Sequence, residues 1–136
     1  MSITHHDHCF GCGPSNAAGI RVQLERDSDG AVSGRFLVEP HHQGPPGYAH
    51  GGIVAAALDE AMSLAVHAEG VLALTARLEI DLRAPAPVGA FVALSARVAE
   101  RGDGKLRVTS RAHAEDEDHA LIAEGVALFV EQRSGS

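Results

Sequence analysis

Short stretches in which apolar and polar residues alternate run along most of this chain. They predict β-strands, because successive side chains of a strand lie on opposite faces of a sheet. In the first stretch, Ile20, Val22 and Leu24 alternate with Arg21 and Gln23. Turn-forming Gly, Pro, Asn and Asp residues separate the stretches from one another. The predicted strands are residues 20–25, 31–38, 77–83, 92–98, 106–112 and 119–130.

Residues 51–67 have a different pattern, because their apolar side chains cover nearly every face of a helix. Such a helix must be buried, and it is shorter than the roughly 20 residues of a membrane span. The predicted order is β-β-α-β-β-β-β, and short connections favour hairpins between successive strands among the last four. We expect an α+β fold in which one long, curved antiparallel sheet wraps around this central helix. A flat, open sheet would leave half of the helix in water.

A glycine-rich loop leads into this helix, and a single carboxylate lies about two turns inside it. The loop begins at Gly44 and ends in His50-Gly51-Gly52, and Asp59 follows on the apolar helix. Backbone N–H groups at a helix start can hold a developing negative charge. A carboxylate on an apolar helix is costly unless it has partners or a task. Gly51 and Asp59 therefore indicate acyl chemistry, with an oxyanion donor and an acid, base or nucleophile.

Gly51 and Asp59 are too far apart on one helix to act on the same carbonyl group. Eight residues of helix span about 12 Å. An oxyanion donor and an attacking group must each lie about 3 Å from the reacting carbonyl. The two residues form a site only if a two-fold dimer brings Gly51 of one subunit beside Asp59 of the other.

Neighbouring polar residues are assigned supporting roles. Ser63, one turn after Asp59, is predicted to hold the attacking water or the carboxylate. His50 either contacts the substrate oxygen or only braces the loop through a backbone hydrogen bond. Glu60 points about 100° away from Asp59 around the helix, so only one of the two faces the site. We expect Glu60 to be solvated or to lie at an interface.

The composition narrows the range of partners. The chain has 136 residues, 45% of them hydrophobic and 4% aromatic, which predicts one domain with an aliphatic core. The formal net charge of −7 argues against nucleic acid, whose binding requires clustered Lys and Arg. No apolar run approaches the roughly 20 residues of a membrane span. The polar, His-rich start also lacks the apolar stretch of a secretion signal, so we expect a cytoplasmic protein without a membrane partner.

Residues 1–19 are rich in Gly, Pro, Ser and Asn and predict an irregular N-terminal arm, followed by one domain at residues 20–133. Cys9 and Cys12 are only three positions apart, and a structural disulfide framework is not expected in a cytoplasmic protein. Together with the nearby histidines they would suit zinc, which takes four N or S ligands. There is no second Cys pair and the stretch is terminal, so a structural arm is favoured and no metal is assigned. The histidines are His5, His6 and His8.

The run from Gly44 to Asp59, followed by a strand from Thr75 that ends in a turn at Pro85, resembles hotdog-fold acyl-CoA thioesterases of the phenylacetate-pathway and 4-hydroxybenzoyl-CoA types. The match lies in His-Gly-Gly with a carboxylate eight residues after Gly51, set within the predicted order of elements. The run H-C-F-G-C-G near the start looks like the N-terminal signature of one branch. The resemblance covers nearly the whole chain.

This resemblance implies hydrolysis of an acyl-CoA thioester, with Gly51 as oxyanion donor and Asp59 as base or nucleophile. It implies coenzyme A as the leaving group, no separate cofactor, and a homodimer or a dimer of dimers. Many family members carry Asn where this chain has Gly44, and Gln43 is the neighbouring candidate to replace it. For Arg83 the expected partner is a CoA phosphate, with a solvated sheet face as the equal alternative. The predicted substrate-binding residues are Gly52, Gly44, Gln43, Thr75 and Arg83.

Two other functions are compatible with a hotdog fold. The first is a non-catalytic acyl-CoA-binding or regulatory protein. Asp59 argues against it, because a pure binder of an anionic ligand gains little from a nearby carboxylate. The second is a dehydratase or hydratase, which uses a paired His and acid that the sequence does not show beside the central helix. The acyl group is not defined, although the few aromatic residues mildly disfavour an aryl substrate.

Overall fold

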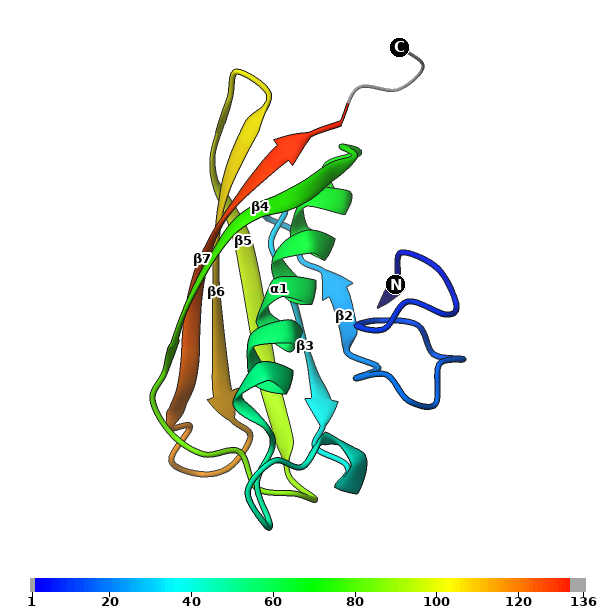
Figure 1. Cartoon of the computed structure of the whole chain (residues 1–136). Helices are drawn as coiled ribbons and strands as arrows, with labels where there is room; N and C mark the ends of the chain where they lie inside the picture. The colour runs from blue at the N-terminus through cyan, green and yellow to red at the C-terminus, as the bar shows by residue number, and fades with distance from the viewer. Residues whose placement is uncertain (1, 133–136) are drawn as a thin grey trace.

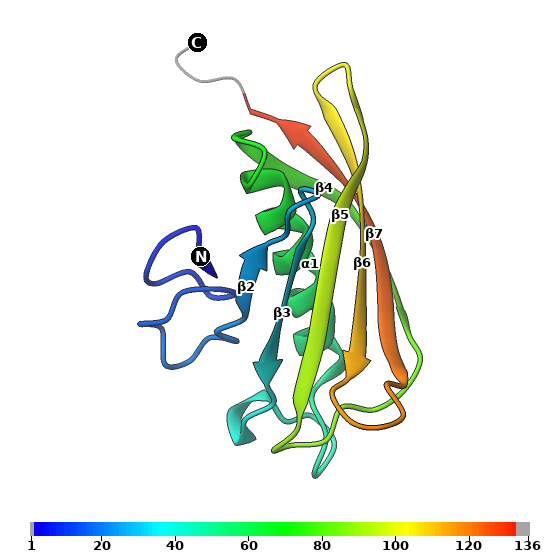
Figure 2. The same cartoon turned by 180° about the vertical axis from the view of Figure 1, so that it is seen from behind.

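The computed structural model describes residues 2–132, which form one antiparallel sheet curved around one long helix (Figures 1 and 2). The order across the sheet is β1-β2-β3-β5-β6-β7-β4. The α+β fold and the β-β-α-β-β-β-β order are confirmed, with one short extra strand at the start. The strands are β1 (Ser2–Ile3), β2 (Gln23–Arg26), β3 (Val32–Leu37), β4 (Ala73–Leu82), β5 (Phe91–Gly102), β6 (Lys105–Ala114) and β7 (Leu121–Glu131), and the helical segments are η1 (Pro40–His42) and α1 (Gly51–His67).

One predicted strand pairing is wrong. β5–β6 and β6–β7 are hairpins as expected, but β4 pairs with β7 and not with β5. β5 lies beside β3 instead. In the chain, α1 connects β3 to β4, and it lies across the concave face of the sheet (Figure 1). The chain therefore leaves the helix at the far edge of the sheet from β3. There β4 pairs with β7, which would otherwise be the edge strand on that side.

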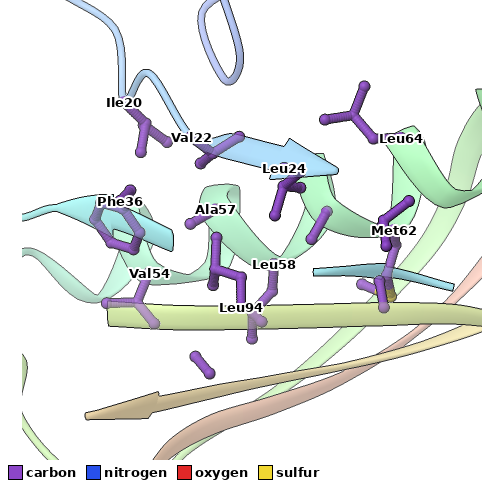
Figure 3. Close-up of a cluster of buried hydrophobic side chains, with 14 of the residues drawn as sticks. Ile20, Val22, Leu24, Phe36, Val54, Ala57, Leu58, Met62, Leu64 and Leu94 are labelled. Carbon is purple, nitrogen blue, oxygen red and sulfur yellow. The ribbon is translucent and has the colours of Figure 1, made fainter. Parts of the chain in front are cut away.

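The core lies between α1 and the concave face of the sheet (Figure 3). The side chains that α1 turns toward the sheet are almost fully buried, with Leu58 and Met62 at 0% exposure. On its other side Ile53, Ala56 and Asp59 are only half-buried. The expected burial therefore holds for the sheet side of α1, while part of its opposite face remains accessible in the single chain. Neither helical segment in residues 2–132 is long and apolar enough to cross a membrane.

The N-terminal arm packs against the rest of the chain. The N–H groups of Ile20 and Val22 bond to the carbonyl groups of Phe10 and Gly11, both at 2.8 Å. These bonds explain why β2 begins at Gln23, later than the alternating pattern predicts. Figure 1 shows the arm, in blue, beside β2. The boundary between the arm and the domain at residues 19 and 20 remains a prediction. The predicted end of the domain, at residue 133, lies outside the described residues.

Candidate active site

The start of α1 leaves one backbone N–H group free. His50 caps the helix with an extended backbone (φ −61°, ψ 137°), and its Nδ1 accepts a hydrogen bond from the Gly52 N–H at 2.9 Å. The N–H groups of Ile53 and Val54 donate to the His50 carbonyl at 2.9 and 3.2 Å. Within residues 2–132 the Gly51 N–H has no acceptor. Gly51 therefore presents a donor at the positive end of the helix dipole, whereas the donor of Gly52 is occupied.

The loop before α1 is held by its own groups. The side-chain oxygen of Gln43 accepts a hydrogen bond from the Gly47 N–H, and the Gly44 N–H donates to the Tyr48 carbonyl at 2.9 Å. A Cβ added to Gly44 would lie only 2.8 Å from the Cα of His50. The backbone of His50 thus excludes a side chain at position 44. The Gln43 oxygen stabilises the loop in this structure, and its role as a replacement for Asn remains a prediction.

Asp59 faces β4 from the middle of α1. Thr75 Oγ1 donates a hydrogen bond to Asp59 Oδ1 at 2.8 Å. Burial raises the pKa of Asp59, and the hydrogen bond from Thr75 lowers it in part, so the net shift is upward. Within the described residues Asp59 Oδ2 has no hydrogen-bond partner. One oxygen of the carboxylate is therefore held in place while the other is available to water or to a substrate.

A β-bulge aims Thr75 at the helix. The register between β4 and β7 shifts between Thr75 and Arg77. Thr75 and Leu78 are opposite Phe129 and Ala127, two core residues of β7 with 0% and 2% exposure. A regular strand would place residues 75 and 78 on opposite faces, because side chains alternate. The extra residue moves Thr75 to the concave face, where it reaches Asp59.

Glu60 points away from Asp59 and toward the arm. Its Oε2 lies 2.7 Å from His5 Nδ1, and its side chain is only 12% exposed. Glu60 is therefore not solvated, which corrects that part of the expectation, and its position at an interface stays a prediction. It is not solvated because the arm folds over this side of α1. The two adjacent carboxylates do diverge, as the helix geometry predicts.

Ser63 also contacts the arm. Its Oγ lies 3.0 Å from His5 Nε2, and within the described residues it has no hydrogen bond to Asp59. Its assigned role beside Asp59 therefore remains a prediction. His5 Nδ1, the sulfur atoms of Cys9 and Cys12 and a carboxylate oxygen of Glu60 all lie within 4.8 Å of one another. Hydrogen bonds to Cys12 and Glu60 raise the pKa of His5 to about 11, against the opposing effect of burial.

Arg83 is engaged at the surface. Its guanidinium donates to Glu124 Oε1 at 2.9 Å and lies 3.8 Å from a carboxylate oxygen of Asp81. These acids raise the pKa of Arg83, the hydrogen bond to Glu124 having the largest effect. In the single chain the Arg83 guanidinium thus contacts carboxylates, and its predicted binding of a CoA phosphate remains a prediction.

The structure keeps the two parts of the site apart. α1 is continuous from Gly51 to His67. The distance of about 12 Å along its axis between Gly51 and Asp59 is therefore preserved. His50, Gly51 and Gly52 lie together at the helix start, and Asp59 and Thr75 lie together further along. Neither group by itself surrounds a single carbonyl.

A curved antiparallel sheet around one helix, with a glycine start and a carboxylate on that helix, is the arrangement of hotdog thioesterases. Residues 46–120 match the family model described as Thioesterase superfamily. The chain therefore belongs to the thioesterase superfamily.

Individual relatives agree with this assignment. The chain is 34% identical over 96 residues to a Xenopus laevis protein named acyl-coenzyme A thioesterase THEM4. The aligned region covers 70% of this chain but 42% of the relative. The chain thus spans less than half of that protein. A solved thioesterase superfamily protein, RHA08564, aligns with a TM-score of 0.83 and 30% identity over 91% of this chain and 60% of the other. A hypothetical thioesterase from Streptococcus pneumoniae TIGR4, solved with coenzyme A, aligns with a TM-score of 0.75 and 16% identity over 85% and 88%.

Proposed function

We propose that this chain hydrolyses acyl-CoA thioesters to a carboxylic acid and coenzyme A. Membership of the thioesterase superfamily, the name of the THEM4 relative and the coenzyme A bound to a structural neighbour all support this proposal. The observation that carries it is that one helix presents both a free Gly51 N–H and a half-buried Asp59 held by Thr75. These are the two groups that acyl transfer to water requires.

The site is completed by a second copy of the chain. β4 is the last strand of the sheet, and its outer edge has no pairing partner within residues 2–132. Leucines in and beside this strand are unusually exposed for apolar residues. A dimer that covers the β4 edge would bury them and would satisfy the free backbone groups of the edge. The exposures are 65% for Leu72, 59% for Leu74, 39% for Leu78 and 55% for Leu82.

In the proposed reaction, Gly51 of one subunit polarises the thioester carbonyl and Asp59 of the partner subunit acts on its carbon. As a base, Asp59 takes a proton from water while the water oxygen bonds to the carbonyl carbon. The Gly51 N–H and the helix dipole stabilise the oxyanion that results. The C–S bond then breaks, and the coenzyme A thiolate leaves and is protonated.

Asp59 can alternatively attack the carbonyl carbon itself. This step expels the thiolate and gives a mixed anhydride, which water then hydrolyses. Both routes require the same residues in the same places. The proposal therefore rests on the positions of Gly51 and Asp59 and holds for either route.

Replacement of Asp59 tests the proposal. Asp59→Asn keeps the size of the side chain and removes the base or nucleophile. We expect the rate of thiol release from a panel of acyl-CoAs to fall by about 10²- to 10⁴-fold, the usual contribution of such a group. Thiol release is followed with a chromogenic disulfide, and folding by the thermal unfolding midpoint.

Asp81→Asn is the matched control, because Asp81 is an exposed carboxylate on β4 that faces away from α1. It should retain wild-type turnover. A wild-type chain that binds acyl-CoA tightly but releases no thiol from any member of the panel would support the non-catalytic binding function instead. Near-native turnover by Asp59→Asn would exclude the assigned role of Asp59.

A further inference from the structure

The N-terminal arm and α1 bring four metal-binding side chains to one point. His5, Cys9 and Cys12 come from the arm, and Glu60 comes from the side of α1 that faces away from Thr75. We propose that these four residues bind one zinc ion, which fixes the arm to the central helix. This site lies outside the proposed hydrolysis and is independent of it.

The distances between the candidate ligand atoms fit a tetrahedral site. Zinc bonds of about 2.3 Å to sulfur and 2.0–2.1 Å to nitrogen or oxygen place S and N or O ligands about 3.5–3.6 Å apart in a tetrahedron. The observed separations are 3.7 and 3.5 Å from His5 Nδ1 to the sulfurs of Cys9 and Cys12, and 3.7 Å from Cys9 Sγ to Glu60 Oε2. The 2.7 Å between His5 Nδ1 and Glu60 Oε2 is shorter than this tetrahedral separation. It is the length of a hydrogen bond, whose proton a metal would displace.

The surroundings orient the ligands as metal sites require. Ser63 Oγ lies 3.0 Å from His5 Nε2, so the ring nitrogen away from the cluster has a partner and Nδ1 is directed inward. The backbone N–H of His5 donates to Cys12 Sγ at 3.1 Å, which stabilises a thiolate there. Gly11, between the two cysteines, is so close to Glu60 that a Cβ would lie 2.4 Å from the Glu60 Cγ. Gly11 thus allows the Cys-x-x-Cys turn to reach the carboxylate.

The set of donors favours zinc with a structural role. Two thiolates, one neutral imidazole and one carboxylate provide four ligands of the types that zinc prefers and leave no position for a water. When zinc binds, the protons of the two thiols and of the His5–Glu60 hydrogen bond pass to solvent. No oxidation or reduction is involved.

A second group of candidate ligands, formed by Glu39, His41 and His42, does not fit a metal in the same way. Both ring nitrogens of His42 are occupied, because Nδ1 accepts from the Glu39 N–H at 3.0 Å and Nε2 lies 3.0 Å from the Gly19 carbonyl. The Glu39 carboxylate is already paired with Arg21 at 2.7 Å. The cluster around Glu60 is therefore the better metal site.

The test measures metal in the whole chain, purified under reducing conditions without a polyhistidine tag. After zinc is supplied and excess is removed by gel filtration, elemental analysis should give about one zinc per chain, as a four-ligand site requires. Cobalt in place of zinc should produce the thiolate-to-cobalt absorption of a tetrahedral sulfur site. Less than a tenth of an equivalent, or a cobalt spectrum without thiolate absorption, would overturn the proposal.

Variants test which residues bind. Cys9→Ser and Glu60→Gln should each lower zinc affinity by well over tenfold, and Ser63→Ala by about 10- to 100-fold as an outer partner of His5. The matched controls are His6→Ala and His8→Ala, which remove exposed histidines of the same arm and should leave zinc affinity unchanged. Equal zinc content in Cys9→Ser and wild type would contradict the assignment.

The outcome is separable from that of the proposed hydrolysis. Asp59→Asn should keep a full equivalent of zinc, because Asp59 points to Thr75 and not into the cluster. A metal-containing but inactive wild type would refute only the hydrolysis. An active wild type that binds no zinc would refute only the metal site.

Discussion

At the scale of single residues, Gly51 and Gly52 differ in what their N–H groups do. The Gly52 N–H is bonded to the His50 ring, whereas the Gly51 N–H has no acceptor within residues 2–132. The sequence alone does not separate the two glycines, because both lie at the helix start. The His50 cap separates them, since a capping side chain satisfies one early N–H and leaves its neighbour free.

Removal of that single N–H tests its role. Proline at position 51 lacks the N–H, fits the first position of a helix, and follows a residue whose backbone is already extended at ψ 137°. We expect Gly51→Pro to lower kcat by about 10²- to 10³-fold, the usual cost of losing one oxyanion donor. Thiol-release kinetics on the purified variant measure this loss.

Gly51→Ala is the matched control. It adds a Cβ that meets only the end of the flexible Leu82 side chain, at 3.0 Å, and it keeps the N–H. It should stay within a few-fold of wild type. Equal activity of the proline and alanine variants would show that the Gly51 N–H does not contribute to the reaction.

The spacing of Gly51 and Asp59 follows from the sequence, because helix geometry fixes it. The partners of Thr75 and Glu60 do not follow from the sequence in the same way. Thr75 reaches Asp59 only through a bulge in β4, and Glu60 meets His5 only because the arm folds back over α1. Such contacts depend on strand register and on residues far apart in the chain, which local patterns do not encode.

At the scale of elements, β4 combines three properties that a regular strand would not have together. It forms the edge of the sheet, it carries exposed leucines, and its bulge turns Thr75 toward α1. The period-2 pattern of Leu78, Ile80 and Leu82 correctly predicts a strand here. It does not predict which strand pairs with β4. The short connection between β4 and β5 favours a hairpin, but α1 leads the chain to the edge of the sheet where β7 lies.

Replacement of Thr75 tests its hydrogen bond to Asp59. Thr75→Val keeps the shape of the side chain and removes the hydroxyl that donates to Asp59 Oδ1. We expect Thr75→Val to reduce turnover, while Thr75→Ser, which keeps the hydroxyl, retains most activity. Steady-state kinetics and the thermal unfolding midpoint of both variants provide the comparison. Equal turnover of Thr75→Val and Thr75→Ser would mean that this hydrogen bond does not contribute to the reaction.

At the scale of the whole molecule, the proposed site requires two chains, so two inactive variants should complement each other in a mixed dimer. Gly51→Pro and Asp59→Asn each damage both sites of a homodimer. A heterodimer of the two variants should contain one site with neither change and one site with both. We expect the heterodimer, co-expressed and purified with two different tags, to recover about half of the wild-type activity.

The mixed dimer distinguishes a shared site from a site within one chain. If Gly51 and Asp59 of the same chain acted together, the heterodimer would remain as inactive as its two parents. A homodimer of the double variant is the control for recovery through any other route. It should stay inactive under the same conditions.

The arm that packs against α1 also has a consequence for the order in which the chain folds. Cys9 and Glu60 are separated by 51 positions, and His5 and Ser63 by 58. The arm leaves the ribosome before α1, yet its contacts on α1 do not exist until that helix has been synthesised and has folded. Closing so long a loop has an entropic cost that only a formed partner offsets. A segment that is made before α1 therefore reaches its final position only after α1 has formed.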